Sequence, residues 1–485
     1  MAELKLSRIN KKPFVIAFFY ALITIFAVFH HEIWADEAQV WMLTKYISLP
    51  ELFPHLVNEG HPPFFYLIVM PFAKLFNNII WMQLICWFSS VLAIFLLWNN
   101  SKFSSLTKTI ITLSAPFIYF FPTIARSYSI IPLLVFLLAI FHNKTNKHPF
   151  IYSITLFLLF NLHSIMYVFC AFLGIRFLLK SFKDKKLTIP SIIVILGFLA
   201  PLILLFKTTS SNVAINFENK DYMGSIARVF GLFIFNSFDS FFIKANSLKL
   251  NFYSILMPVL TIISWLFINI LIFKNNKKIF LLFFLSVFSQ FLIYVLTYSY
   301  HIYPIRIYIV YVVAIFSFWV ILKDENKKLL NLALIFVFLL TFINSFKNYY
   351  GDLLFDYTPS YKLSKYIKQN IDLNNSEIYI DNPQYSIALA YYLTPKFYLI
   401  NIHNEKPLKY IYWKNYPLLS DENWRNFFIS KRNEGNKKEL YALINYNYYQ
   451  GFLVYDFSDK YFEPIYKTGA SLVPSETFTL YKFKE

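Results

Sequence analysis

The sequence predicts a polytopic α-helical membrane protein with a C-terminal α/β domain. Hydrophobic residues make up 57% of the 485-residue chain and charged residues 15%, with 57 Phe and 36 Tyr, which the surface of a soluble protein of this length would not tolerate. Long apolar runs recur between short basic clusters, as in membrane spans joined by loops. From Asn348 onward Asn, Asp, Lys and Tyr replace the apolar runs. We therefore predict a transmembrane domain over residues 1–346 and an α/β domain over residues 347–485.

The first predicted span follows a basic stretch with Lys5, Arg8, Lys11 and Lys12. This stretch resembles the start of a signal peptide, but no small-residue cleavage site follows, so we expect a retained helix. One crossing takes roughly twenty apolar residues, and on this measure the sequence predicts eleven spans. They cover residues 13–31, 79–98, 108–121, 127–142, 150–162, 165–181, 188–206, 252–273, 279–298, 306–322 and 329–346.

Residues 62–78 decide the topology, because they are apolar but short, begin with two prolines and carry Lys74. If they form an amphipathic surface helix at the outer interface, every basic loop lies on the same side as the basic N-terminus; if they span, every basic loop lies outside. The loops concerned contain Lys102 and Lys108, Lys144 and Lys147, Lys180 to Lys186, Lys274 to Lys278, and Lys323 to Lys328. The positive-inside rule therefore predicts a surface helix and an extracytoplasmic C-terminal domain.

The sequence also predicts structure in one long loop and in the C-terminal region. Within residues 207–251, the run near 224–242 is apolar enough to lie partly inserted in the outer interface. After residue 347, helical and strand patterns alternate as in a small α/β domain. We expect helices at 360–371, 386–393 and 422–432, and strands at 377–382, 396–401, 439–446, 452–457 and 477–483.

Charge, cysteine and glycine usage exclude several functions. The net charge is +18, but the basic residues lie between apolar runs, where they act as topology signals and contacts to membrane lipids, so we expect no nucleic acid partner. Cys86 and Cys170 both fall in predicted spans, which argues against a disulfide or a thiolate metal site. With nine Gly and no glycine-rich phosphate loop or GxSxG motif, a dinucleotide, Walker or hydrolase site is improbable.

The stretch from Trp34 to Pro63 concentrates polar residues in an otherwise apolar region. Asp36 and Glu37 are adjacent, and Glu59 and His61 follow. Two neighbouring carboxylates at a membrane surface cost desolvation and repulsion, so the pair indicates a function. The alternative is a solvated loop in which Asp36 caps a helix over residues 37–47.

Three further polar positions fall at outer ends of predicted spans. Arg126, in PTIARSYSIIP, precedes Tyr128 by two residues, and its planar fork suits bidentate phosphate binding, with snorkelling toward headgroups as an equal alternative. Arg306, in HIYPIRIYIVY, lies at a similar depth. So does His163, in NLHSIMY, although a lone His there is more often a core hydrogen-bonding residue than a catalyst.

Together these motifs resemble the GT-C glycosyltransferases, and most closely the bacterial family 39 group of protein mannosyltransferases and the lipid A aminoarabinose transferase. The motifs are DE after the first span, HPPFFY at the surface helix, ARSY after the third span, a His before the sixth and an Arg-containing turn near the last spans. The resemblance, over residues 13–346, implies an inverting enzyme that uses a polyprenyl-phosphate sugar donor outside a bacterial cytoplasmic membrane. It implies that Asp36 is the catalytic acid of the first outer loop, Glu37 its partner, His61 the HPP histidine and Arg126 the phosphate-binding arginine.

The sequence departs from that family at one position. Family members commonly carry an Asp or Glu two residues before the arginine, where this chain has Ile124. A role of that carboxylate in metal or acceptor binding is therefore missing or transferred, with Glu59 as the candidate.

The chemistry of the residues agrees with this resemblance. A polyprenyl phosphate is a good leaving group, so the site needs cations such as Arg126 and Arg306 to neutralise its developing charge. Asp36 would act as the base that deprotonates the acceptor in a single inverting displacement. Glu37 would orient Asp36, raise its pKa by repulsion, or hold a divalent cation together with Glu59; the sequence indicates no other cofactor. The residues expected to contact substrate are His61, Glu59, Tyr128 and His163.

The acceptor stays open, as a lipid, a glycan or a protein. Two other classes share many of these features. A polyprenyl-linked glycan polymerase or ligase also uses outward-facing arginines but usually lacks the early acidic pair. A lipid or sugar transporter would place its charges near the membrane midplane and show related halves, whereas here the polar cluster lies at one face.

Overall fold

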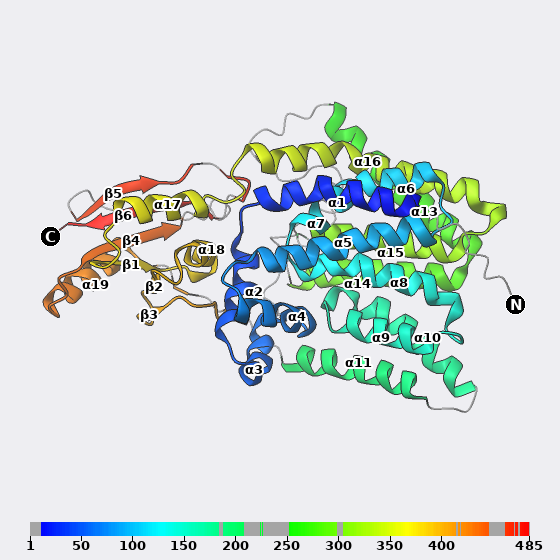
Figure 1. Ribbon diagram of the computed structural model, residues 1–485, viewed down its shortest axis with the longest axis horizontal. Helices are drawn as coiled ribbons and strands as arrows, with labels where there is room; N and C mark the ends of the chain where they lie inside the picture. Colours follow the sequence, from blue (N-terminus) through cyan, green and yellow to red (C-terminus); the bar gives the residue numbers. More distant parts are fainter. Residues whose placement is uncertain are drawn as a thin grey trace, which may run out of the picture.

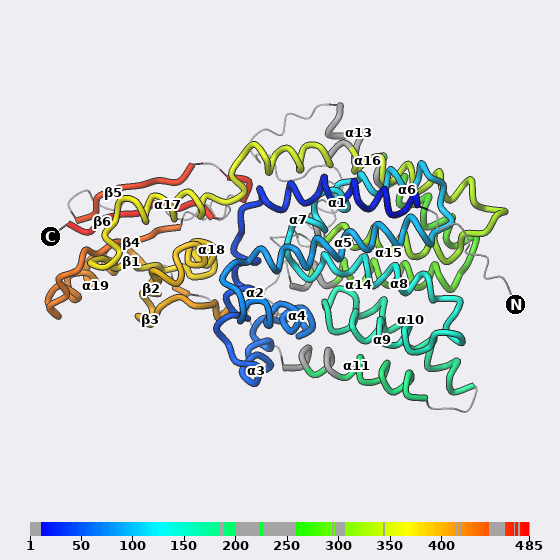
Figure 2. The backbone as a smooth tube through the Cα atoms, viewed as in Figure 1, coloured from blue at the N-terminus to red at the C-terminus, as the bar shows by residue number. Residues whose placement is uncertain are grey.

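The computed structural model describes residues 11–183, 188–207, 224, 226, 252–297, 304–413, 416–417, 419–445, 461–469, 471–473 and 476–484. Long helices form a bundle on one side of the molecule and a sheet with its own helices lies on the other (Figure 1). Short helices occupy the junction between the two parts (Figures 1 and 2). The expected helix near 224–242, apart from Gly224 and Ile226, and the expected strand at 452–457 lie outside the described residues.

Each of the eleven predicted spans contains helical segments where the structure describes it. The helices are α1 (Lys12–His30), α5 (Ile80–Asn100), α6 (Ser105–Leu113) with α7 (Phe121–Thr123), α8 (Ile131–Phe141), α9 (Pro149–Phe160), α10 (Tyr167–Lys183), α11 (Ile189–Lys207), α13 (Phe252–Asn275), α14 (Lys277–Thr297), α15 (Pro304–Ile321) and α16 (Lys327–Leu354). Among the described residues, five helical segments are long and apolar enough to cross a membrane by length and composition, and shorter apolar helices accompany them.

The outer face of α1 shows what kind of surface the bundle has. Phe14, Phe18, Phe19 and Phe26 are each at least half exposed although all are large and apolar. A continuous apolar face of this kind is unfavourable in water and favourable in lipid. The predicted polytopic membrane architecture is therefore confirmed.

The third predicted span is not one continuous helix. It breaks after α6, and the π-helical turn Pro116–Phe120 precedes α7. Pro116 has no N–H group to continue the hydrogen-bond ladder of an α-helix. The Tyr20 hydroxyl of α1 donates to the Phe117 carbonyl at 2.5 Å, so a neighbouring helix helps to satisfy the irregular backbone, as membrane interiors require.

The junction consists of α2 (Ala35–Tyr46), α3 (Leu49–Glu59) and α4 (Phe64–Leu75). Helix α4 is seen nearly end-on in Figure 1, whereas the long bundle helices run across the same view. Its 12 residues fall short of the roughly 20 that a crossing needs. Residues 62–78 therefore form a short helix across the end of the bundle, as predicted.

The C-terminal part contains one six-stranded mixed sheet in the order β3-β2-β1-β4-β6-β5. Its elements are α17 (Ser360–Asn370), β1 (Ser376–Ile380), α18 (Pro383–Leu393), β2 (Ile400–Asn401), β3 (Lys406–Pro407), α19 (Asp421–Asn433), β4 (Glu439–Asn445), β5 (Phe462–Lys467) and β6 (Phe478–Phe483). The sequence did not predict β3 or β5. Strand β5 contains Pro464 and lies at the edge of the sheet, where proline is tolerated because an edge strand needs fewer backbone donors.

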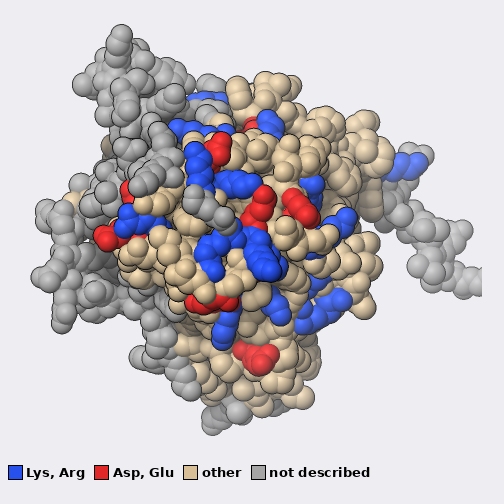
Figure 3. Space-filling view, turned by 90° about the vertical axis from the view of Figure 1, so that its left-hand side faces the viewer, with Lys and Arg blue, Asp and Glu red and all other residues tan. Residues whose placement is uncertain are grey.

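The two parts of the chain differ in their surfaces and share one helix. The end of the molecule formed by the C-terminal part shows Lys and Arg interspersed with Asp and Glu (Figure 3). Ion pairs within this part include Lys431–Glu405 at 2.6 Å and Lys482–Glu439 at 2.5 Å. Such a surface is typical of a domain in water. Helix α16 continues to Leu354, so the predicted boundary after residue 346 falls inside it.

Candidate active site

Asp36 and Arg126 meet at the end of the bundle next to the sheet. Oδ2 of Asp36 lies 3.7 Å from Nη2 of Arg126, and Nη1 of Arg126 donates a hydrogen bond to the Asp36 carbonyl. The Asp36 side chain is 23% exposed and that of Arg126 is 8% exposed. Helix α2 begins at Ala35 with Trp34 at the N-cap position, so Asp36 lies in the first turn and is not the cap residue. A partly accessible carboxylate thus stands beside a nearly buried cation.

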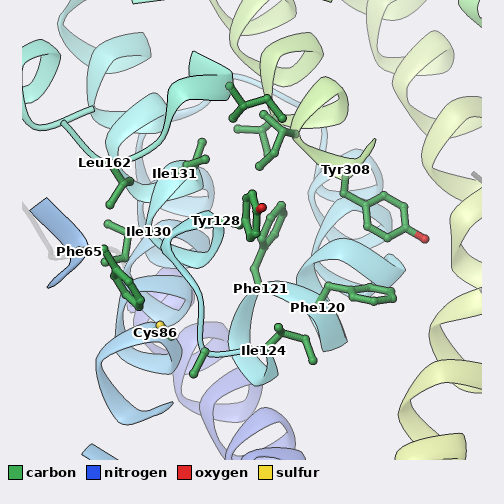
Figure 4. Close-up of a cluster of buried hydrophobic side chains, with 14 of the residues drawn as sticks. Phe65, Cys86, Phe120, Phe121, Ile124, Tyr128, Ile130, Ile131, Leu162 and Tyr308 are labelled. Carbon is green, nitrogen blue, oxygen red and sulfur yellow. The ribbon is translucent and has the colours of Figure 1, made fainter. Parts of the chain in front are cut away.

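Arg306 brings a second cation to the same place. Its Nε donates to the Tyr128 hydroxyl at 2.8 Å, and its guanidinium lies 6.0 Å from the centroid of the Tyr128 ring. Figure 4 shows Tyr128 beside Phe121, within a layer of apolar side chains from several helices. Arg126 and Arg306 are both buried and close enough to repel each other electrostatically. Two buried like charges are unfavourable alone, so this arrangement is suited to an anion.

Two histidines complete this cluster. The ring centroids of His61 and His163 are 5.1 Å apart, and those of Tyr128 and His163 are 4.5 Å apart. Burial and the nearby Arg126 and Arg306 lower the pKa of His61 to about 3. Burial, His61 and the same arginines lower the pKa of His163 well below its usual value. Both rings are therefore neutral at ordinary pH.

Each histidine leaves one ring nitrogen for another molecule. Nδ1 of His163 accepts a hydrogen bond from the Ile165 N–H at 3.1 Å, so its Nε2 carries the proton. Within the described residues, this Nε2 and Nδ1 of His61 are buried and have no hydrogen-bond partner. Buried polar groups without partners call for an explanation, and a bound substrate would supply one.

Glu37 holds the segments of the site together. Its Oε1 accepts the Ala125 N–H at 2.6 Å, and its Oε2 accepts the Trp34 N–H at 3.3 Å. The side chain is fully buried. Glu37 therefore joins the start of α2 to the turn that presents Arg126, which makes it a positioning residue for the ion pair.

His31 ties this carboxylate to a distant helix. Its Nε2 lies 3.1 Å from Oε2 of Glu37, and its Nδ1 lies 2.8 Å from Oδ2 of Asp352 in α16. The Tyr119 hydroxyl also donates to Asp352, at 2.9 Å. Burial would lower the pKa of His31, but Asp352 and Glu37 outweigh it and raise the pKa to about 10. His31 is thus a buried cation between two carboxylates.

The sheet domain anchors α2 from the other side. Glu476, which precedes β6, accepts the Ala35 N–H at 2.7 Å through Oε1. The amide of Gln39 donates to the Ile411 carbonyl at 3.1 Å and accepts the Ile411 N–H at 2.8 Å. Burial raises the pKa of Glu476 well above its usual value. Helix α2, which carries Asp36, therefore takes part of its support from the C-terminal domain.

Glu59 belongs to a polar group that adjoins the Asp36–Arg126 pair through Tyr66. Its Oε1 accepts from Gln39 Nε2 at 2.7 Å and from His55 Nε2 at 3.2 Å, and its Oε2 accepts from the Tyr66 hydroxyl at 3.3 Å. No group of three or more His, Cys, Asp or Glu among the described residues has metal-binding geometry. A cation held between Glu37 and Glu59 would leave several donors without acceptors. The surroundings of the two residues therefore do not fit a shared cation site.

The structure brings six of the eight predicted site residues to one place, and the other two support or adjoin them. The six are Asp36, Arg126, Tyr128, Arg306, His61 and His163. Glu37 and Glu59 are buried and hydrogen-bonded to protein groups. Sequence reasoning missed His31, Asp352 and Glu476. A signal existed for His31, which directly follows the helix α1 and precedes Asp36 by only five residues.

One solved structure supports the fold. The chain matches the crystal structure of ArnT from Cupriavidus metallidurans bound to undecaprenyl phosphate over 98% of both chains, with a TM-score of 0.51 and 9% identity. At this identity the likeness shows the fold alone, and it confirms the predicted architecture of a polytopic helical membrane protein with a C-terminal domain. No family model matches the chain, and no curated protein matches it.

Proposed function

We propose that the protein is an inverting glycosyltransferase that moves a sugar from a polyprenyl-phosphate donor to a lipid, glycan or protein acceptor. The observation that carries the proposal is the meeting of Asp36 with two buried arginines at one end of the bundle. The sugar would be a hexose or a pentose. ArnT, which shares the fold, binds undecaprenyl phosphate, and a similar lipid phosphate would suit the two arginines here.

The donor phosphate would bind between Arg126 and Arg306. The Arg126 fork now contacts the carbonyl and carboxylate of Asp36, and a phosphate would compete for the same N–H groups because bidentate contacts to phosphate are strong. Tyr128, already hydrogen-bonded to Arg306, would turn its hydroxyl proton toward the phosphate. Donor binding thereby loosens the hold of Arg126 on Asp36 and leaves the carboxylate free to act as a base.

The transfer is a single displacement. A lone pair of the acceptor hydroxyl or amine attacks the anomeric carbon while the bond from that carbon to the phosphate oxygen breaks. The electron pair goes to the phosphate, where Arg126 and Arg306 stabilise the added charge. The acceptor proton goes to Oδ of Asp36. Attack from the face opposite the phosphate inverts the anomeric centre.

The histidines would bind without adding charge. Because His61 and His163 are neutral, their unpaired ring nitrogens suit sugar or phosphate oxygens without competing for the charge held by the arginines. Burial and the two cations favour this neutral state for His61. We assign them to substrate orientation.

We also propose that the site and the sheet domain face the outside of the bacterial cytoplasmic membrane. Basic residues gather at the opposite end of the bundle, where Lys12, Lys108 and Lys327 are close enough to influence one another. Asn326, next to Lys327, is hydrogen-bonded to Asn275 of another basic turn. Basic residues concentrated at one end are typical of the cytoplasmic side.

Binding of undecaprenyl phosphate to the purified full-length protein tests the donor site. Arg126→Lys keeps the charge but loses the fork, so the dissociation constant should rise by about 10- to 100-fold, equivalent to the roughly 1.5–3 kcal/mol of a hydrogen bond to a charged group. Arg425→Lys, on the exposed surface of the sheet domain, is the matched control and should bind normally. Equal affinity of Arg126→Lys and the control would mean that Arg126 only snorkels toward headgroups.

A further inference from the structure

A second polar cavity lies at the end of the bundle away from Asp36. Helix α8 begins next to the Arg126 turn and ends at the 3-10 turn His142–Lys144. There a cavity of about 130 Å³ opens between this turn, α9 and α10. Its polar lining includes His142, Asn143, Thr145, Tyr152, Arg176 and Lys180. The catalytic proposal uses none of these residues.

The lining has one sign of charge. Arg176 and Lys180 lie one turn apart on α10, and in the part of the chain that the structure describes no Asp or Glu lines the cavity. Lys180 Nζ donates to Thr145 Oγ1 at 3.3 Å, which brings α10 to the turn after α8. The floor is aromatic, with the Tyr152 and Phe177 rings stacked at 5.7 Å. Cations above an apolar floor suit an anionic group attached to a lipid.

His142 adds a buried donor. Nη1 of Arg176 hydrogen-bonds to Nε2 of His142, and because a guanidinium only donates, Nε2 is the acceptor and Nδ1 carries the proton. His142 is 4% exposed, and within the described residues its Nδ1 has no hydrogen-bond partner. The pair therefore offers N–H groups that need an acceptor.

We propose that this cavity binds a phosphate-bearing anion, with Arg176 and Lys180 as its charged contacts and His142 as a neutral donor. Two sources share this chemistry, the headgroup of an anionic phospholipid and a free phosphate. The cavity volume is several times the roughly 30 Å³ of one liquid water, which accommodates a phosphate group. Basic pockets between membrane helices on the cytoplasmic side commonly hold lipid headgroups.

Native mass spectrometry of the full-length protein tests the site. Protein released from detergent is titrated with phosphatidylglycerol in one arm and with phosphatidylcholine in a second. A third arm uses phosphatidylglycerol together with millimolar inorganic phosphate. We expect one phosphatidylglycerol to be retained at least tenfold more tightly than phosphatidylcholine. If inorganic phosphate displaces the bound phosphatidylglycerol, the ligand of the cavity is a soluble phosphate. If the phosphatidylglycerol stays bound, the ligand is the lipid headgroup.

Three variants distinguish lipid binding in this cavity from general attraction of anionic lipids to basic surfaces of the protein. Arg176 and Lys180 are both exposed at the rim of the cavity, and Arg176→Gln and Lys180→Gln should each weaken phosphatidylglycerol retention by about tenfold, as expected for loss of one charge-assisted hydrogen bond. The control Lys277→Gln/Lys278→Gln removes two exposed lysines from another basic turn and should retain the lipid. Equal retention of the two lipids, or equal weakening in the control, would overturn the proposal.

Discussion

At the scale of single residues, the site depends on charges that are buried in pairs. A buried carboxylate without a partner is strongly destabilising, whereas one that contacts a cation and backbone N–H groups is tolerated. Glu37 meets this condition through His31 and the Ala125 N–H, and Asp352 does so through His31 and Tyr119. His31 therefore matters to the stability of the whole site although it contacts no substrate.

The His31→Gln variant should lose stability in a pH-dependent way. The pKa of His31 is raised to about 10 in the folded protein, compared with roughly 6.5 in the unfolded chain. Its contribution to the free energy of unfolding is therefore fully present below roughly pH 6.5 and is lost progressively as the pH rises to the folded pKa. Removal of one partner from a buried pair costs roughly 3–5 kcal/mol. Thermal unfolding of the purified protein between pH 6 and pH 10.5 should show the largest deficit at pH 6, and the deficit should shrink steadily above about pH 6.5 and level off near pH 10.

The neighbouring His30 is the control for that experiment. It is exposed and bonds only to the Phe26 carbonyl of its own helix. His30→Gln should unfold as the wild type does at every pH. A deficit in His31→Gln that stays constant from pH 6 to pH 10.5 would show that His31 is not charged in the folded protein.

Single residues also show where sequence reasoning ends. Asp36, Arg126, Tyr128 and Arg306 could be singled out because each is polar at the end of an apolar run. The partners of His31 and Glu476 could not, because they lie 321 and 441 residues away in the chain. Such pairs follow from tertiary packing, and no local pattern encodes them. The hydrogen-bond donors around Glu37 and Glu59 could not be predicted either, since local spacing does not reveal which groups contact a buried carboxylate.

At the scale of elements, periodicity and length predicted the helices well and the short strands poorly. The long helices α5 and α16 follow runs of apolar residues that exceed one crossing, so their existence needs no tertiary information. The break around Pro116 was not predicted, although proline gives a local reason for it. Strand β2 covers only Ile400–Asn401 of the predicted 396–401, because pairing with β1 and β3, not propensity, sets its length.

Helix α2 provides an element-scale prediction. Its first N–H groups need acceptors, and Glu476 supplies one for Ala35. Glu476→Ala should leave the protein folded but misplace Asp36, and turnover should fall by about tenfold or more, since small displacements of a catalytic group are costly. Glu476→Gln should keep most of the activity, because burial raises the pKa of the acid and the neutral acid and the amide both present a carbonyl oxygen.

The matched control for Glu476 is Glu463→Ala in β5, which removes an exposed glutamate from the same domain. Turnover and donor affinity are measured for all three variants in the same membranes. If Glu476→Ala turns over like Glu463→Ala, the sheet domain does not position α2.

At the scale of the whole molecule, the account requires the site and the sheet domain to lie on one side of the membrane. Helix α2 contacts α18 of the sheet domain, and Glu476, just before β6, accepts a hydrogen bond from the first residue of α2. The site and the sheet domain therefore cannot lie on opposite sides of the membrane. Alkaline phosphatase fused after Glu485 should be active in cells, because that enzyme matures only outside the cytoplasm, and a cytoplasmic reporter fused there should be silent. The reverse pattern would make residues 62–78 a span.

The central claim is that Asp36 is the base, and Asp36→Asn tests it most directly. Asparagine keeps the size and much of the hydrogen bonding but cannot take the acceptor proton. With a panel of radiolabelled polyprenyl-phosphate sugars and membrane acceptors, turnover should fall by roughly 10² to 10⁴ while undecaprenyl phosphate still binds. Asp324→Asn, at an exposed turn on the other end of the bundle, should turn over normally. An Asp36→Asn enzyme that turns over as fast as this control would contradict the account.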